Sequence, residues 1–291
     1  MRLSLVIPAK NKNDPKLQDL LRSIDAQDFP KDEMEVLVIT EGTSESAKAI
    51  GIKRAKGEVI GILASDNEIM HKSFLRTMVS YATLNDSCYP ALYVHKSDDN
   101  LLNRYFALIG GNDPLAFYMN KNDRFPYFDG ICNPSGSIGD NGFFIKRSLI
   151  EKTDLDNYFH IDNALESVGS SNPVFGEFIW HKTGGNIFHF FAKRYRYGLQ
   201  HAFNPNRRWH LVDFSKPKDI VRLIWFILAT LTVIQPLSLS IRGWLKIRDV
   251  AWFLHPLVCL MTLGVYTVLV IHHVLRRIFQ SSSAPMDGQI A

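Results

Sequence analysis

Carboxylates that follow two apolar segments are the side chains most suited to chemistry in the first third of the chain. Val59–Leu63 is a β-branched and apolar run that predicts a buried strand, and Asp66 comes just after it. Glu35–Ile39 predicts a second strand, which Glu41 follows. Ligands of open α/β sheets bind at the carboxyl ends of the strands, so Asp66 is placed to reach a metal ion and, through it, a diphosphate. Taken alone, Asp66 is better explained as part of an Asx turn or a helix cap.

More polar candidates stand at turns and strand ends later in the chain. Asp140 and Asn141 lie between two glycines and precede an aromatic stretch, which predicts either a structural turn or a contact with a sugar. Asp162 can act as a general base if it lies in a partly dry cleft. The segment after it, Asn163–Glu166, has the spacing of a capping box, and in that interpretation Asp162 only favours the helix N-terminus. His181 is a candidate for completing a metal shell.

A basic and aromatic segment, Lys193–Tyr197, contains two arginines that are suited to phosphate. A planar guanidinium holds phosphate oxygens bidentately and stacks on aromatic rings, so Arg194 and Arg196 can stabilise the charge on a departing nucleoside diphosphate. Basic residues continue as far as Lys218, and the alternative is a juxtamembrane segment attracted to anionic lipid at ~1 kcal/mol per charge. The two interpretations are compatible.

Strands and helices are expected to alternate through the part of the chain that contains Glu41 and Asp66. Leu3–Pro8 predicts a strand, Pro15–Ala26 the helix after it, and Ser44–Ala55 a further helix. This alternation is typical of an α/β fold. The later expected elements are helices at 69–85 and Leu101–Ile109 and strands at Tyr89–Val94, Phe143–Arg147 and Phe175–Ile179.

The composition of the 291 residues fits one substantial core with a membrane segment in addition. Hydrophobic residues make up 46%, and the formal net charge of +4 is too small to favour nucleic acid as a partner. Cys88, Cys132 and Cys259 are widely spaced, so we expect them to be reduced and structural. The first residues hold only a short apolar run, and we therefore expect no secretory signal and a first domain in the cytosol.

Two uncharged segments near the C-terminus, Leu223–Leu239 and Val250–Ile271, approach the ~20 residues that span a bilayer core. We predict two spans in a hairpin. The alternative is that one or both segments lie in the membrane interface, with Trp225, Trp244 and Trp252 at headgroup level. The predicted parts are a catalytic domain at 1–217, a membrane-anchoring helical hairpin at 218–278 and a disordered tail at 279–291.

Four segments, taken in order, resemble those of family-2 glycosyltransferases of the GT-A fold. They are L-S-L-V-I-P-A-K-N at Leu3–Asn11, S-I-D-A-Q at Ser23–Gln27, E-V-L-V-I-T-E-G-T-S-E at Glu35–Glu45 and A-K-G-E-V-I-G-I-L-A-S-D-N-E at Ala55–Glu68. The resemblance covers roughly residues 1–200. It implies a Rossmann-like α/β domain with a mostly parallel mixed sheet flanked by helices.

The two acidic motifs of that family are altered in this chain. The family usually ends its second strand in Asp-Asp-Gly-Ser and its third in Asp-x-Asp, where this chain has Thr40-Glu41 and Ala64-Ser65-Asp66. The resemblance implies that Glu41 contacts the nucleobase and that Asp66 holds the metal and the diphosphate. Ala64 removes the leading carboxylate of the metal motif.

The resemblance also implies roles for the other candidates. The residues implied for donor binding are Pro8, Ala9, Glu41, Ser65, Asp66 and Asn67, and those implied for the acceptor or sugar side are Asp140 and Asn141. The residues implied for catalysis are Asp162, Arg194 and Arg196. A divalent metal, Mn2+ or Mg2+, would be bound by Asp66 and His181.

These features predict a membrane-associated, metal-dependent and inverting glycosyltransferase that moves a hexosyl or N-acetylhexosaminyl group. We expect the donor to be a UDP- or GDP-sugar and the acceptor to be lipid-linked or a polysaccharide. We place the chain in the cytoplasmic or inner membrane as an integral protein in contact with membrane lipid, with its catalytic domain facing the cytosol. The alternative, which Ala64 favours, is a non-catalytic subunit that binds nucleotide sugar or polymer within a membrane glycan-assembly complex.

Overall fold

The computed structural model of the chain divides into two compact units. It describes residues 1–92, 99–109, 113–119, 141–151, 174–182, 186–202 and 212–282. The first unit holds Met1–Asn112 and Asn120–Thr183, and the second holds Asp113–Met119 and Gly184–Ala291. The units divide at Thr183, whereas the sequence predicted the end of the catalytic domain at residue 217. The boundary between a catalytic and a membrane-anchoring domain stays a prediction.

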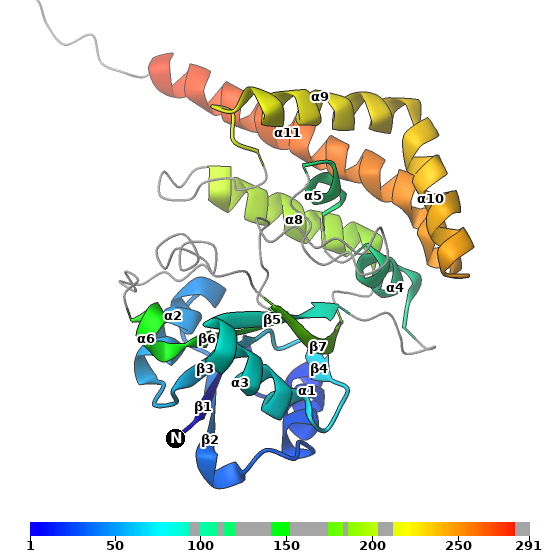
Figure 1. Cartoon of the computed structure of the whole chain (residues 1–291). Coiled ribbons are helices and arrows are strands. Elements are labelled where there is room, and N and C mark those ends of the chain that lie inside the picture. The colour runs from blue at the N-terminus through cyan, green and yellow to red at the C-terminus, as the bar shows by residue number, and fades with distance from the viewer. Residues whose placement is uncertain are drawn as a thin grey trace, which may run out of the picture. The chain divides into compact units, whose positions relative to one another are not determined.

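A seven-stranded mixed sheet forms the first unit, with strand order β2-β1-β3-β6-β5-β7-β4 (Figure 1). Among the described strands, β1 pairs in parallel with β2 and β3, and β5 with β7, whereas β3–β6, β5–β6 and β4–β7 are antiparallel. The strands are β1 Leu3–Pro8, β2 Met34–Ile39, β3 Val59–Leu63, β4 Asn67–Ile69, β5 Ser87–Leu92, β6 Asn141–Lys146 and β7 Val174–His181. The helices are α1 Pro15–Asp25, α2 Ser44–Arg54, α3 Phe74–Asn85, α4 Leu101–Leu108 and α6 Arg147–Ile150, with a 3₁₀ turn η1 at Lys31–Glu33.

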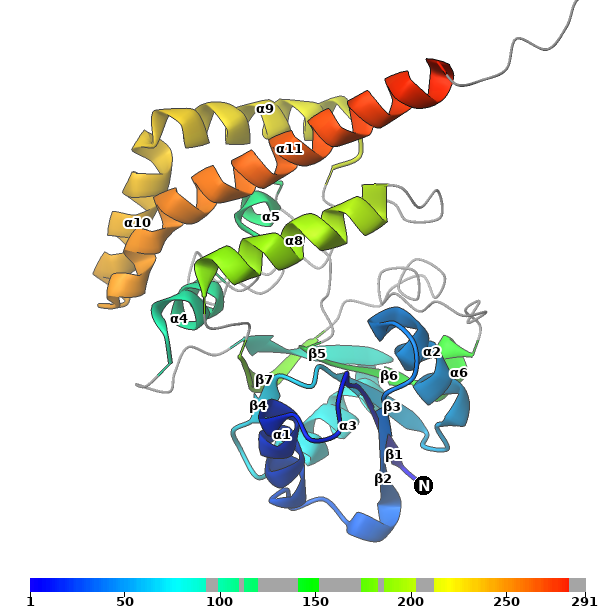
Figure 2. The same ribbon diagram turned by 180° about the vertical axis from the view of Figure 1, so that it is seen from behind.

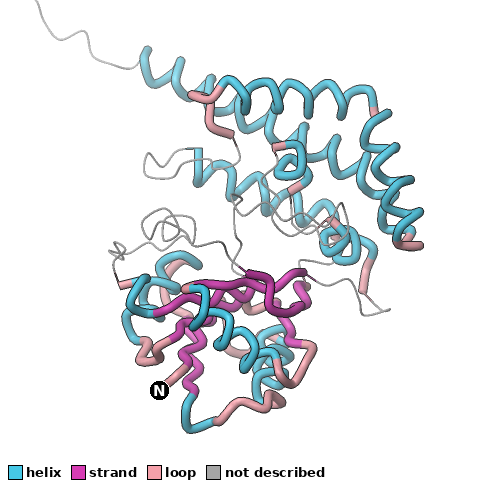
Figure 3. Tube along the Cα trace, in the orientation of Figure 1, coloured by secondary structure: helices cyan, strands magenta, loops and turns pink. Residues whose placement is uncertain are grey.

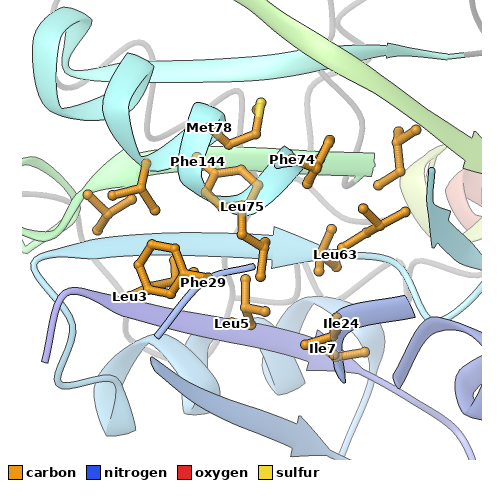
Figure 4. Packing of buried hydrophobic residues seen from close by; sticks show 14 of the residues in the cluster. Leu3, Leu5, Ile7, Ile24, Phe29, Leu63, Phe74, Leu75, Met78 and Phe144 are labelled. Atoms are coloured by element: carbon orange, nitrogen blue, oxygen red, sulfur yellow. The ribbon is translucent and has the colours of Figure 1, made fainter. Parts of the chain in front are cut away.

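Helices cover both faces of this sheet because successive strand residues point to opposite sides. Leu3, Leu5 and Ile7 of β1 pack with α1 and α3 in one buried cluster, which Figure 4 shows from close by. Val6 of β1 packs in a second cluster with Ile52 of α2 and with residues of β3 and β6. Seen from behind, α1 and α2 flank the strands (Figure 2). The first unit is therefore a three-layer α/β/α domain.

Most of the elements expected in the first unit are confirmed with small shifts at their ends. The expected helix at 69–85 is shorter, because residues 67–69 form strand β4 and the helix α3 begins only at Phe74. Strand β4 has three residues, too few to show the alternation that marks a strand in sequence. Its partner β7 lies more than a hundred residues later in the chain, so only long-range pairing reveals it.

The second unit is helical, as the tube in Figure 3 shows. Its described elements are α5 Pro114–Tyr118, α8 Ile187–Ala202, α9 Pro217–Thr232, α10 Ile234–Lys246, the 3₁₀ helix η2 Val250–Leu254 and α11 His255–Ser282. Helices α8 and α11 approach closely at Gly198, where an added Cβ would lie 2.2 Å from Cδ1 of Leu269. Tyr118 of α5 donates a hydrogen bond to Gln235 of α10, and its ring packs on Phe226 of α9.

One described helix is long and apolar enough to cross a membrane, where the sequence predicted two spans. It covers Val250–Arg276, which is 27 residues long and contains an 18-residue stretch with a mean hydropathy of 2.0. The first expected span, Leu223–Leu239, is instead shared between α9 and α10, which are bent by 83°. The prediction of a second span holds for this segment only if the bent pair is one broken span, and the interfacial alternative stays a prediction.

The bend between α9 and α10 has a cause in the sequence. Pro236 has no N–H to donate to the carbonyl of Thr232, and its ring would clash with that carbonyl in a continuous helix. The chain turns one residue later, at Val233, which takes the left-handed conformation with φ of 61° and ψ of −15°.

Candidate functional site

The carboxyl ends of β1, β2 and β3 form one edge of the sheet and bring the donor-binding candidates to it. Strand β1 lies between β2 and β3 and is parallel to both, so all three strands end on the same side. Neighbouring strands lie ~4.8 Å apart, which puts the ends of β2 and β3 about 10 Å apart. Pro8 ends β1, and the N–H of Ala9 donates to the carbonyl of Ile39 at the end of β2 at 2.9 Å.

Glu41 follows β2 at this edge and is exposed. Its carboxylate faces the Arg54 guanidinium at 3.4 Å, with side-chain exposures of 62% and 53%. A turn brings it there, since Gly42 has φ of 76° and Thr43 caps helix α2 through a capping box with Ser46. A carboxylate that pairs with a guanidinium on the surface can exchange this weak pair for a ligand.

Asp66 follows β3 and is three-quarters buried beside His181. Its Oδ1 lies 3.3 Å from Nε2 of His181, and the side chains are 21% and 11% exposed. The pairing of β4 with β7 delivers the histidine, because Asn67 is the register partner of His181. The carbonyl of Asp66 accepts from the N–H of Lys182 at 2.8 Å, which holds its main chain.

Two buried asparagines adjoin this pair. Nδ2 of Asn67 donates to Oδ1 of Asn141 at 3.0 Å, and Nδ2 of Asn141 lies 3.5 Å from Nδ1 of His181. Asn141 opens β6, where the register with β3 shifts by a bulge at Leu63. Gly142 follows with φ of 84°, and an added Cβ there would lie 2.8 Å from Cγ of Pro90. Only glycine fits this position without strain, so the local backbone fixes where Asn141 enters the site.

Lys182 ties the end of β7 to two other elements. Its Nζ lies 2.9 Å from Oδ2 of Asp19 in α1 and 2.7 Å from Oε2 of Glu68 in β4. The hydrogen bond from Lys182 lowers the pKa of Asp19. Burial acts to lower the pKa of Lys182, but its bonds to Glu68 and Asp19 outweigh burial, and the pKa is raised. Lys16 also donates to the Lys182 carbonyl at 2.7 Å.

Arg194 and Arg196 differ in their surroundings within the second unit. Arg194 forms an ion pair with Asp113, and the Tyr266 hydroxyl donates to the same carboxylate oxygen. Burial acts to lower the pKa of Arg194, but Asp113 and Tyr266 outweigh it and leave that pKa raised. Arg196 is exposed on the same helix. Arg194 therefore has a structural partner, whereas Arg196 faces outward.

Asp140 and Asp162 lie outside the described residues, so their roles stay predictions. Ser65 and Asn67 lie with Asp66 after β3. No motif in the sequence singles out Lys182, Asp19, Glu68 or Asp113. Lysines and carboxylates occur throughout the chain, and only the fold shows which of them meet.

A divalent metal fits this edge when a diphosphate supplies part of its shell. The described residues contain no group of three or more His, Cys, Asp and Glu side chains that could hold an ion by themselves. Mg2+ is usually bound by one or two carboxylates together with substrate phosphates, so the single carboxylate of Asp66 is compatible with such a site.

No protein-family model matches the chain, and no curated protein matches it in sequence. Among solved structures, it is similar to the mannosyltransferase PcManGT from Pyrobaculum calidifontis in complex with GDP-Man and Mn2+, at 12% identity and a TM-score of 0.50, over 92% of this chain and 87% of that one. It is also similar to S. aureus TarS 1-349, at 15% identity and a TM-score of 0.43 over 78% and 72% of the two chains. The complex of TarS 1-349 with UDP-GlcNAc matches at 15% identity and a TM-score of 0.44, over 92% and 90%.

The likeness to PcManGT is one of fold. At 12% identity it shows that the chain has a GT-A-like glycosyltransferase architecture, as the resemblance implied.

Proposed function

We propose that the chain is a membrane-associated glycosyltransferase that moves a sugar from a UDP- or GDP-sugar to a lipid-linked or polysaccharide acceptor. One observation carries the proposal: Glu41 and Asp66 follow the two strands that flank β1, at the carboxyl edge where α/β sheets bind nucleotides. The fold shared with a mannosyltransferase in complex with GDP-Man and Mn2+ supports it.

In this proposal the edge of the sheet binds the donor. Glu41 contacts the nucleoside, Pro8 and Ala9 line the end of β1, and Asp66 with its neighbour Ser65 faces the diphosphate. Asn67 was predicted to bind the donor as well, but it is 1% exposed, and its amide instead holds the Ala64 N–H behind this loop. A bound Mn2+ or Mg2+ would neutralise charge on the diphosphate.

The acceptor side of the proposal rests on residues from later in the chain. Asp162 is the proposed base for an inverting transfer, and Asp140 and Asn141 are the residues proposed for the sugar side. Of the two arginines, Arg196 is the one we propose for the charge of the leaving diphosphate, because it is exposed on α8 whereas Arg194 pairs with Asp113.

For the membrane part, we propose that α11 crosses the bilayer and that the bent pair α9–α10 lies in the interface. Large apolar side chains are exposed on all three helices, among them Trp225 of α9, Ile241 of α10 and Val270 of α11. A pair bent by 83° suits an interfacial position better than a straight span. The first unit then faces the cytosol, where nucleotide sugars are available.

The test is release of nucleoside diphosphate from a panel of UDP- and GDP-sugars by membranes that carry the full chain. We expect the wild type to release nucleoside diphosphate from one donor in the presence of Mn2+ or Mg2+. In Asp66→Ala the rate of release should fall about 100-fold or more, because the loss of a residue that only supports a metal ligand already costs about 10–100-fold in metal affinity or activity. Asp25→Ala removes an exposed carboxylate at the end of α1 and serves as the matched control. Equal release by wild type and Asp66→Ala would overturn the assignment.

A second candidate is a non-catalytic subunit that binds nucleotide sugar or polymer. Ala64 favours it, because the leading carboxylate of the metal motif is absent and the Ala64 N–H is instead bonded to Asn67 at 2.8 Å. Binding of a labelled nucleotide sugar without release from any donor would support this function over transfer.

A further inference from the structure

The hydrogen bonds around Asn67 define which way its side-chain amide points. The N–H of Ala64 lies 2.8 Å from the Asn67 amide atom on one side, and a backbone N–H is always a donor, so that atom is the oxygen. The other amide atom lies 3.4 Å from the carbonyl of Trp180, which is always an acceptor. That atom is therefore the Nδ2 group. Backbone groups on both sides thus fix the orientation of the amide, without any choice of flip.

The orientation of Asn67 determines that of Asn141. Nδ2 of Asn67 lies 3.0 Å from a side-chain atom of Asn141, which must then be the accepting oxygen. The Nδ2 group of Asn141 consequently faces Nδ1 of His181 at 3.5 Å. Asn67 and Asn141 are 1% and 8% exposed, so water competes little for these amides. A donor that faces Nδ1 requires Nδ1 to be an acceptor without a proton.

We propose that Asn67 and Asn141 hold neutral His181 as the tautomer with the proton on Nε2, so that His181 positions Asp66 by an Nε2–H hydrogen bond and does not ligate the metal. The nitrogen in question lies 3.3 Å from Oδ1 of Asp66. A nitrogen that carries a proton has no lone pair for an ion. The expectation that His181 is a metal ligand is replaced by a positioning role for it.

This inference depends on the proposed function in one respect, which is that Asp66 binds a divalent metal. A carboxylate has two oxygens and about four acceptor sites, so a bond from His181 to Oδ1 is compatible with metal binding by Asp66. Ligating groups are commonly oriented by hydrogen bonds from outside the metal shell, and loss of such a partner costs about 10–100-fold in metal affinity.

The first experiment uses metal-free full-length protein with isotopically labelled histidine. Proton–nitrogen NMR correlations within the imidazole identify which nitrogen carries the proton, and His181→Gln assigns the signals by their loss. We expect a proton on Nε2 and none on Nδ1 in the neutral ring. In Asn141→Asp residue 141 can only accept, so Nδ1 should gain a proton while Nε2 keeps its own, which makes the ring an imidazolium between two carboxylates. A proton on Nδ1 in the wild type would overturn the proposal, as would an Asn141→Asp variant with the wild-type tautomer.

The second experiment measures manganese binding by electron paramagnetic resonance. We expect no nitrogen coupling from His181 and an affinity about 10–100-fold lower in His181→Ala. His181→Gln should restore the affinity, because the glutamine amide places an N–H donor near the position of Nε2. Nitrogen coupling that disappears in His181→Gln would show a metal ligand and refute the positioning role.

Failure of the two proposals is distinguishable. If manganese does not bind at all, the metal dependence of the proposed function fails. The tautomer of the metal-free protein still decides the inference about Asn67, Asn141 and His181.

Discussion

Nζ of Lys182 lies 2.7 Å from Oε2 of Glu68, and this ion pair fastens the end of β7 to β4 beside Asp66 and His181. The same ammonium reaches Asp19 of α1 at 2.9 Å. Lys182→Met keeps most of the side-chain volume but removes both pairs. We expect it to lower the free energy of unfolding of the first unit by about 1 kcal/mol, because the pairs are only partly buried. Denaturant unfolding of the full chain followed by circular dichroism checks the value, with Lys10→Met as an exposed control.

The stabilisation by Lys182 should depend on pH at both ends of the scale. The hydrogen bond from Lys182 lowers the pKa of Asp19 in the folded state, so the contribution of Asp19 is present above the unfolded pKa and is lost as pH falls through the folded pKa. The pKa of Lys182 is raised in the folded state by Glu68 and Asp19 against the effect of burial, so its contribution is present below the unfolded pKa and is lost as pH rises through the folded pKa. The difference in unfolding free energy between wild type and Lys182→Met should be greatest between about pH 5 and pH 9 and should shrink outside it. A difference that stays constant down to acid pH would contradict the assignment.

Glu41→Gln separates a donor contact from a structural role. The pair of Glu41 with Arg54 is exposed and its atoms are 3.4 Å apart, so its loss should change the free energy of unfolding by less than about 0.5 kcal/mol. If Glu41 contacts the nucleoside, KM for the donor should rise about 10- to 100-fold, as for loss of a charged hydrogen bond, with little change in kcat. Steady-state kinetics of nucleoside diphosphate release measure both constants. Arg54→Gln is the control, and an unchanged KM in Glu41→Gln would remove the nucleoside contact.

Arg194 and Arg196 should respond in opposite ways to the same substitution. Arg194→Met leaves Asp113 without its guanidinium partner, and breaking a buried ion pair costs about 3–5 kcal/mol. Arg196→Met alters an exposed residue, so the free energy of unfolding should change by no more than about 0.5 kcal/mol. The same substitution should lower kcat. Thermal unfolding in detergent and turnover in vesicles give the two readouts. An Arg194→Met protein of wild-type stability would show that the ion pair contributes nothing.

Val233→Gly should stabilise the second unit. Val233 has φ of 61°, and the left-handed conformation costs an L-residue about 1–2 kcal/mol that glycine avoids. We expect a gain of about 1 kcal/mol in the free energy of unfolding. Val233→Ile keeps the strained backbone and should gain nothing. A lower Tm for Val233→Gly would indicate that the valine side chain contributes more than its backbone costs.

The elements of the first unit were predictable where their signals are local. Val59–Leu63 is apolar throughout and is a strand with the same bounds in the structure, and Pro15 begins α1 where Asp14 caps it. Strand β4 was not predictable, since its three residues acquire strand geometry only by pairing with β7. The first apolar segment near the C-terminus was predicted as a span, with an interfacial position as the alternative, and its Pro236 is the local signal for the break.

The sequence by itself determined the alternation of strands and helices, the carboxylates that end the second and third strands, and the apolar character of the C-terminal helices. Those features depend on neighbouring residues, because side-chain periodicity, proline and glycine act over a few positions. Only the tertiary structure decided that His181 meets Asp66, that Asn141 lies between Asn67 and the imidazole, and that Arg194 is paired with Asp113. These contacts join residues far apart in the chain, and the direction of a hydrogen bond depends on which donors and acceptors the fold places around it.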